Sequence, residues 1–163
     1  MARTSPYGDT YLLCGHFDYL GVFGEEGGVV DNKTTKNMLG GSYFSGFSPH
    51  VQMDTYDMVA PILFPDLDFS WCCIDAIQIM TDTIRTGRHF FRKTQGQRVE
   101  HYEMLMEVID RAEKYSAADK WPMDKSSCTM CEFKGVCSAP IEDRPAILAQ
   151  DFKTDFWNPM RSR

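Results

Sequence analysis

The stretch TYLLCGHFDYLGVFGEEGGVVDNK, residues 10–33, decides the fold that we expect for this chain. Residues 10–23 are rich in Thr, Tyr, Leu, Val and Phe, which favour β-strands. The Glu- and Gly-containing residues 25–28 predict a turn, and residues 29–33 predict a second strand. Together these segments predict a β-hairpin.

The polar side chains of this hairpin carry the candidate chemistry. Side chains alternate between the faces of a strand, so His16 and Asp18 would share one face, as would Asp31 and Lys33. If these faces coincide, two carboxylates suit Mg²⁺ or Mn²⁺, which can lower the pKa of a bound water to make a nucleophile. Lys33 can then orient that water or neutralise charge in the transition state. An Asp-x-Lys sequence by itself more often marks a solvated turn.

The rest of the chain predicts a mixed α/β sheet. Ser48 and Pro49 begin a helix, which Pro61 ends near Ala60. The other expected elements are a Gly- and Ser-rich loop over residues 37–48, a buried strand over 69–81, its hairpin partner over 87–93 and an amphipathic helix over 99–117. The order is strand, strand, helix, strand, strand, helix.

Length and composition exclude several classes of protein. The chain has 163 residues, which allows one domain or one domain with a small appendage. With 43% hydrophobic and 25% charged residues, it is neither disordered, collagen-like nor a long coiled coil. No apolar run approaches the roughly 20 residues of a membrane span, and the N-terminus does not resemble a secretory signal. We therefore expect a soluble, cytoplasmic protein without a membrane partner.

The net charge of −6 hides a gradient along the chain. Residues 1–82 hold three Lys or Arg and eleven Asp or Glu, whereas residues 83–163 hold fourteen and twelve. A metal-dependent enzyme that acts on a phosphate polymer needs both a carboxylate-rich and a basic region. Two solvated surfaces of opposite sign are the plainer interpretation. The candidates for contacts with a DNA backbone are Arg85, Arg88, Arg92 and Lys93.

The six cysteines fall into two groups. Cys72 and Cys73 are neighbours in an apolar segment, where we expect small core residues on opposite faces of a strand. The run CTMCEFKGVC places Cys128, Cys131 and Cys137 in a C-x2-C-x5-C pattern, which indicates a metal site rather than disulfides. Zinc and an iron–sulfur cluster both take thiolate ligands, and three unliganded thiols are the alternative.

Four motifs follow one another in a specific order. Gln52 and Tyr56 are four positions apart on one helix face, although such a pair is often only a surface Gln and a half-buried Tyr. The order is G-x-x-D at 15–18, V-V-D-N-K at 29–33, Q-x-x-x-Y at 52–56 and the cysteine run at 128–137. This order resembles the RecB-like branch of the PD-(D/E)XK nuclease superfamily. It is most similar to the iron–sulfur members, which include CRISPR-associated RecB-like exonucleases, AddB-type recombination subunits and phage relatives.

The resemblance covers about residues 10–137 and implies a role for each motif residue. It implies a restriction-endonuclease-like α/β core, a mixed β-sheet flanked by helices, with a small C-terminal Cys metal module. Asp18 and Asp31 would be metal ligands, with the main-chain carbonyl of Asn32, and Lys33 would be the catalytic lysine. Gln52 and Tyr56 would support the site and contact DNA. Three of the four ligands of a 4Fe–4S cluster would be Cys128, Cys131 and Cys137.

One part of the family pattern is missing. Family members carry an N-terminal helical segment that supplies a further acid or histidine and the first cluster cysteine, and about seventeen residues before Asp18 leave no room for it. The chain would be truncated, or a partner would supply the segment, or His16 and Cys14 would substitute. Cys14 would share the face of His16, which directs it towards the active site and away from the cluster.

The sequence thus predicts an Mg²⁺- or Mn²⁺-dependent deoxyribonuclease, and we expect an exonuclease on single-stranded or frayed ends. We expect a nuclease core over residues 1–120, a Cys module over 121–140 and a tail over 141–163. DNA is the expected substrate, and a helicase, recombinase or CRISPR adaptation subunit is the expected kind of protein partner. A catalytically inactive DNA- or partner-binding subunit and a small metal-binding interaction module are the alternatives.

Overall fold

The structure, a computed structural model, describes residues 2–4, 10–155 and 158. The chain divides into two compact units, residues 1–111 and residues 112–163. Every helix among the described residues is too short or too polar to cross a membrane.

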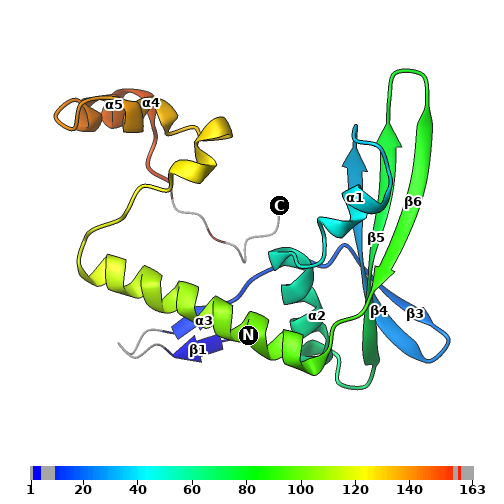
Figure 1. Cartoon of the computed structure of the whole chain (residues 1–163). Helices are drawn as coiled ribbons and strands as arrows, with labels where there is room; N and C mark the ends of the chain where they lie inside the picture. Colours follow the sequence, from blue (N-terminus) through cyan, green and yellow to red (C-terminus); the bar gives the residue numbers. More distant parts are fainter. Residues whose placement is uncertain (1, 5–9, 156–157, 159–163) are drawn as a thin grey trace. The chain divides into compact units, whose positions relative to one another are not determined.

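The first unit is built on a four-stranded mixed sheet (Figure 1). Its strands are β3 (Tyr19–Phe23), β4 (Glu26–Thr35), β5 (Asp68–Ile79) and β6 (Ile84–Phe91), in the spatial order β3-β4-β5-β6. The β3–β4 and β5–β6 pairs are antiparallel, and β4 and β5 are parallel. The predicted α/β class with a mixed sheet is therefore confirmed.

The first hairpin differs from the prediction at both of its ends. Residues 13–18 are not in a strand, and β2 (Thr10–Leu12) instead pairs with β1 (Ala2–Thr4) in a separate two-stranded sheet. The turn lies at Gly24, which has a φ of 66°, and at Glu25, not over residues 25–28. Gly28 lies within β4 and not in the turn. A Cβ at this position would come 2.0 Å from the Trp71 indole, so a glycine here allows close packing.

Two helices occupy the connection from β4 to β5. Helix α1 (Gly41–Ser45) lies within the segment that we expected to be a loop. Helix α2 (Val51–Leu63) continues past Pro61, where we expected it to end. A proline in the last turn removes only one hydrogen bond, and the amide of Phe64 still bonds to the carbonyl of Ala60.

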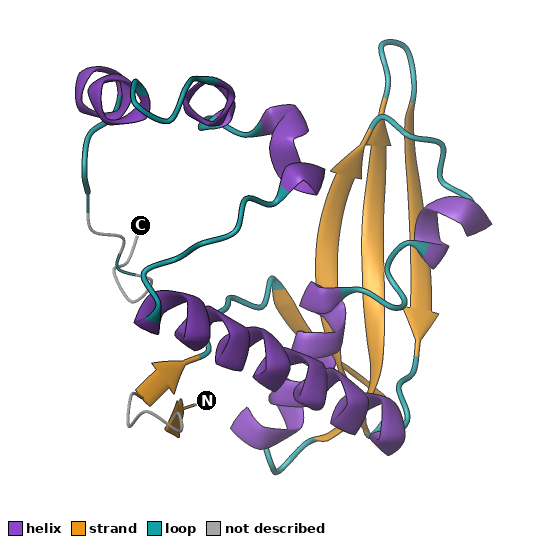
Figure 2. Ribbon diagram, turned by 60° about the vertical axis from the view of Figure 1, so that its left-hand side comes forward, coloured by secondary structure: helices purple, strands orange, loops and turns teal. Residues whose placement is uncertain are grey.

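Helix α3 (Gln95–Ala117) begins before the predicted Val99. Its start is a capping box, because the amide of Gln97 donates to Thr94 Oγ1 and the amide of Thr94 donates to Gln97 Oε1. The T-x-x-Q sequence of residues 94–97 is the signal for this start. Figures 1 and 2 show α2 and the first turns of α3 on the same side of the sheet.

The core lies between the sheet and these helices. Alternate residues of β4 and β5 point towards α1 and α2. The buried cluster comprises Val29, Phe44, Met53, Ala60, Phe69, Cys72, Ile74 and Ala76. Cys72 and Cys73 are 0% and 1% exposed, which confirms that both are buried. Asp31 follows Val29 on the core-facing side of β4, so the packing that holds the sheet also places a carboxylate.

The second unit contains three short helical segments after the last residues of α3. They are the 3₁₀ segment η1 (Lys125–Met130), α4 (Lys134–Ser138) and α5 (Arg144–Asp151). The rings of Phe133 and Phe152 stack with centroids 4.7 Å apart. Arg144 donates to the carbonyls of Cys137 and Ala139, so it links α5 to the end of α4.

Candidate functional site

Asp31 and Lys33 form the centre of the candidate site. Both lie on β4 and face the same side, as the sequence predicted. Asp31 is 1% exposed, and Lys33 Nζ lies 2.6 Å from its Oδ2. Asp31 Oδ1 has no hydrogen-bond partner among the described residues. A buried carboxylate oxygen without a partner is costly, which makes Asp31 the residue here that needs a further ligand.

Gln52 and Tyr56 continue this cluster along α2. Lys33 Nζ donates to Gln52 Oε1 at 3.0 Å, and Gln52 Nε2 donates to Tyr56 Oη at 3.0 Å. The Tyr56 hydroxyl donates to the main-chain carbonyl of His16. One chain of polar contacts therefore runs from β4 across α2 to the segment that leads into β3. The ammonium group of Lys33 is held between a carboxylate and an amide oxygen, which fixes its position.

Asp18 contacts strand β4 from the segment that leads into β3. It precedes β3 directly, and its Oδ2 accepts a hydrogen bond of 2.9 Å from the amide of Asn32. Asn32 lies between Asp31 and Lys33, so the structure brings Asp18 to the main chain of the Asp-x-Lys segment. In a regular hairpin this amide would bond to another main-chain group, and the side chain of Asp18 takes that place.

His16 does not follow the predicted alternation. The premise that it shares a strand face with Asp18 is wrong, because residues 13–18 are not in a strand. Its side chain is exposed, and its contact with the site is through its main-chain carbonyl. Cys14 is also exposed, and its thiol donates to the carbonyl of Leu12 at 3.6 Å.

The donor set at β4 fits a hard divalent cation in kind. Two carboxylates and a main-chain carbonyl offer only oxygen atoms, which Mg²⁺ and Mn²⁺ prefer. The Oδ1 atom of buried Asp31, which has no hydrogen-bond partner among the residues that the structure describes, is open to such a cation. Among the described residues, no three His, Cys, Asp or Glu side chains come together as a metal site. The described residues thus offer two acids and Asn32 near β4, and Asp18 lines a pocket together with Val30 and Asn32, whose side chains alternate with that of Asp31 along the strand.

Most of the predicted DNA-contacting cations are paired within the fold. The Lys93 side chain is 5% exposed, and its Nζ lies 2.8 Å from Asp54 Oδ1, so it is not available to a phosphate at the surface. Arg88 is paired with Asp75 across β5 and β6. Arg85 has no ion-pair partner among the described residues, but it is three residues from Arg88 and so faces the opposite side of the sheet.

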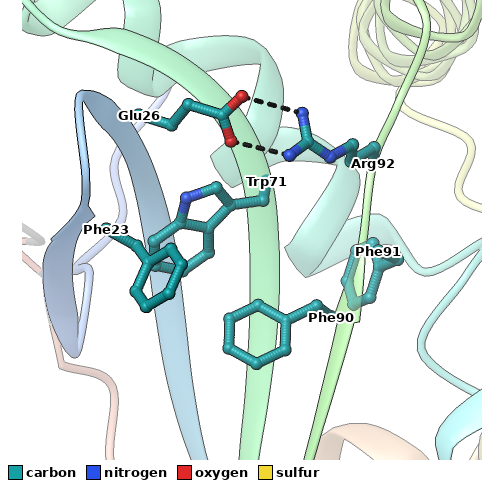
Figure 3. Close-up of a pocket in the computed structure, with 6 residues that line it drawn as sticks. All are labelled: Phe23, Glu26, Trp71, Phe90, Phe91 and Arg92. Atoms are coloured by element: carbon teal, nitrogen blue, oxygen red, sulfur yellow. Dashed lines mark hydrogen bonds and ion pairs between the residues drawn. The ribbon is translucent and has the colours of Figure 1, made fainter.

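Arg92 forms one wall of a pocket on the sheet (Figure 3). Its guanidinium donates two hydrogen bonds to Glu26, of 3.3 and 2.6 Å, and lowers the pKa of that carboxyl below its usual value. The rings of Phe23, Trp71, Phe90 and Phe91 line the rest of this cavity of about 490 Å³. Arg92 is therefore a surface cation with a partner, not a free one.

The three C-terminal cysteines lie in the second unit. Cys128 is in η1, Cys131 follows it and Cys137 is in α4. The amide of Cys131 donates to the carbonyl of Cys128 at 3.5 Å, and the amide of Lys134 donates to that of Cys131 at 3.1 Å. These turns keep the three residues near one another along the chain, but their thiols do not come together as a metal site among the described residues. Whether they bind a metal stays a prediction.

The sequence did not indicate a pocket beside Gln52 and Tyr56. It is a cavity of about 290 Å³ between α2 and the segment before β3, lined in part by Leu13, Phe17 and Val59. The signal was present in α2, where its lining residues 52, 55, 56, 59 and 63 recur at helical spacing. Such a stripe predicts a packed face, and only the structure shows that it is partly open.

Comparison with protein-family models, with curated proteins and with solved structures finds no match for this chain.

Proposed function

We propose that this protein is a divalent-metal-dependent deoxyribonuclease that removes nucleotides from DNA ends. The observation that carries the proposal is the Asp31–Lys33 pair, in which a buried carboxylate keeps one oxygen without a hydrogen-bond partner in the described part of the chain, beside a positioned ammonium group. The motif order in the sequence supports it independently. A buried acid next to a lysine is costly for stability alone, which favours a functional reason for it.

Each residue of the cluster has a role in this proposal. Asp18, Asp31 and the carbonyl of Asn32 would hold Mg²⁺ or Mn²⁺, which when bound polarises a phosphate oxygen and acidifies water. Lys33 orients the attacking water or stabilises the charge that develops on the phosphate. Gln52 holds Lys33 in place through its amide oxygen, and Tyr56 holds Gln52. Cleavage of the P–O bond then releases a phosphate-ended and a hydroxyl-ended product.

Three arginines remain candidates for backbone contacts. The pairs Arg88–Asp75 and Arg92–Glu26 are surface pairs whose arginine side chains are 59% and 62% exposed. Surface pairs of this kind contribute little to stability, so a DNA phosphate can replace the carboxylate. Arg85 needs no such exchange. Binding through these groups would be independent of base sequence and would weaken with salt.

The cysteine segment belongs to the same proposal. Cys128, Cys131 and Cys137 would bind a 4Fe–4S cluster, with zinc as the alternative. Its role would be structural, since a metal and the fold of a short segment stabilise each other. A helicase, a recombinase or a CRISPR adaptation subunit would be the protein partner that presents DNA to the enzyme.

The experiment is a nuclease assay on end-labelled single- and double-stranded DNA with Mg²⁺, Mn²⁺ or EDTA. We expect stepwise shortening with the metals and none with EDTA. Asp31→Asn should abolish cleavage, whereas Asp66→Asn, at an exposed acid of the same unit, should not. Metal should also raise the melting temperature of the wild type but not that of Asp31→Asn. Cleavage that survives EDTA or Asp31→Asn would contradict the proposal.

An inactive nuclease-like subunit that binds DNA or a partner is the second candidate. The observation in its favour is that no group of three acidic, histidine or cysteine side chains forms a metal site among the described residues. This candidate predicts DNA binding, measured by fluorescence anisotropy, without cleavage under any metal. The assay above separates the two candidates directly.

A further inference from the structure

We infer that the pocket beside Gln52 and Tyr56 binds one unstacked nucleobase of a single-stranded DNA end. This inference rests on the proposed function and extends it by naming the form of the substrate. The pocket, referred to below as the base pocket, is the cavity of about 290 Å³ between α2 and the segment before β3.

The walls of the base pocket suit a flat, apolar ligand. The rings of Phe17 and Tyr56 lie with centroids 5.0 Å apart at an interplanar angle of 60°. Leu13, Val59 and Leu63 add aliphatic surface. Small-ligand pockets usually have about 300–1,000 Å³, so this cavity has room for a single base but not for a base pair.

The charges around the base pocket identify which part of a nucleotide it accepts. No Asp, Glu, Lys, Arg or His is among its lining residues in the described part of the chain. The ionised groups Asp31 and Lys33 lie on the other side of Gln52, whose Oε1 accepts from Lys33 at 3.0 Å. A neutral pocket and a charged site that share one residue match a nucleotide, with its base in the pocket and its phosphate at Lys33.

The polar atoms of the base pocket are largely engaged within the protein. Gln52 bonds to both Lys33 and Tyr56, and Tyr56 bonds to the carbonyl of His16. Thr55 Oγ1 donates to the carbonyl of Val51 and contacts His101 Nε2. A base would therefore be held by stacking and apolar contact, which accept any of the four bases.

The pocket also explains a preference for single strands. A base enters it only after leaving its stack, which costs a few kcal/mol in a duplex and least at a single-stranded end. Residues 13–17 pass over α2, so the bound base would be clamped between this segment and the helix. The chain would then cut unpaired or frayed ends and pause at stable duplex.

One arm of the test fills the base pocket with a larger side chain, and the other removes a base from the substrate. Val59→Phe places a ring in the cavity, and Val51→Phe is the same change at a residue of α2 that is 60% exposed and lines another cavity. The substrates are single-stranded oligonucleotides, intact or with one abasic site moved stepwise along the labelled end. For Val59→Phe we expect KM on the intact strand to rise about tenfold, the scale of one stacked base.

For the abasic strand that already lacks the bound base, Val59→Phe should change KM less than twofold, an estimate from the loss of that one contact. Val51→Phe should behave as the wild type on every substrate. Leu63→Trp, at a residue that is 53% exposed, repeats the test where folding is less at risk, with Ile62→Trp as its control at 58% exposure. Equal KM values for filled and unfilled pockets would overturn the inference.

A binding measurement separates this inference from the proposed function. Oligonucleotides carrying the fluorescent base 2-aminopurine are titrated onto the full chain, with Ca²⁺ in place of Mg²⁺. A fluorescence change at one position that is lost in Val59→Phe and Leu63→Trp supports the base pocket even if no variant cleaves DNA. Cleavage that treats intact and abasic strands alike overturns the base pocket and leaves the nuclease proposal standing. If the wild-type protein neither changes the 2-aminopurine fluorescence nor cleaves DNA, both the base pocket and the nuclease proposal are overturned.

Discussion

At the scale of single residues, the site depends on how Lys33 is held. Its ammonium group lies 2.6 Å from Asp31 Oδ2 and 3.0 Å from Gln52 Oε1. The side chain is 28% exposed, so the charge is partly desolvated but remains open to a ligand. In the proposed reaction, a cation placed in this way would act at full strength on charge that develops nearby, because it need not reorient.

Replacing Lys33 with alanine should therefore lower the cleavage rate by about 10²–10³. DNA binding and metal binding should be largely retained, because the change removes a group that acts on the transition state. The measurement is single-turnover cleavage together with DNA affinity. Lys36→Ala, at an exposed lysine just after β4, is the control and should cut at the normal rate. A Lys33→Ala protein as fast as the wild type would remove Lys33 from the mechanism.

At the scale of elements, α3 is joined to α2 by two polar contacts. Arg98 Nε donates to Asp57 Oδ2 at 2.6 Å, and Asp57 is 3% exposed. One turn further along α3, His101 Nε2 lies 2.9 Å from Thr55 Oγ1. Asp57 also accepts a bond from the thiol of Cys72 on β5, so this contact ties both helices to the sheet.

Arg98→Ala should reduce the free energy of unfolding by about 3 kcal/mol. The reason is that Asp57 would keep a buried charge without its cation. Urea denaturation measures the change. Arg111→Ala, which removes the exposed pair with Glu107 at 3.9 Å, should cost at most about 0.5 kcal/mol. Equal losses for the two variants would show that Arg98 contributes no more than a surface pair.

His101 should make the stability depend on pH. Burial lowers the pKa of this histidine below its ordinary 6.5, while Asp54 opposes and Lys93 assists the shift. The unfolded chain therefore binds a proton at a higher pH than the folded chain does, so the free energy of unfolding falls as pH drops below about 6.5. His101→Gln should flatten this part of the curve, which thermal melts between pH 5 and 8 would measure. An unchanged slope would exclude His101 as its source.

At the scale of the whole molecule, two units carry two kinds of candidate metal site. The sheet unit offers oxygen ligands at Asp18, Asp31 and Asn32, and the second unit offers the sulfur atoms of Cys128, Cys131 and Cys137. Hard cations take the first set and zinc or iron–sulfur clusters the second, so the two sites would not compete for one metal. The buried thiols of Cys72 and Cys73 are a separate class, and burial raises the pKa of Cys73 to about 11.

The cysteines of the second unit should bind metal as a group. Protein purified without oxygen should be brown and contain iron, or else contain zinc, as metal analysis would show. Replacing Cys128, Cys131 and Cys137 together with serine should remove the metal and loosen the segment around them, measured by hydrogen exchange. Cys72→Ser should leave the metal content unchanged. Anaerobic protein that is colourless, free of both metals and still ordered at residues 128–137 would contradict a metal role.

The pattern of residues along the chain was enough to predict the fold class and the pairing within the cluster. Side-chain alternation on β4 places Asp31 and Lys33 together, and helical spacing places Gln52 with Tyr56, because both effects are local. The burial of Cys72 and Cys73 follows from the apolar segment around them, whereas the hairpin partner predicted over 87–93 is strand β6 over Ile84–Phe91. The ends of the elements were less predictable. Residues 13–18 are not in a strand, and α2 continues beyond Pro61.

Only the tertiary structure decided which charged groups are paired and which are open. Lys93 and Arg98 look like surface cations in a basic stretch, yet they meet Asp54 and Asp57, which lie about forty positions earlier on α2. The parallel pairing of β4 with β5 brings α2 over the sheet and so creates these contacts, the base pocket and the contact between Lys33 and Gln52. The sequence alone determined which charged, oxygen and sulfur groups each motif offers, because that depends on residue type and local spacing. How the motifs come together in space depends on the chain topology, which no local pattern encodes.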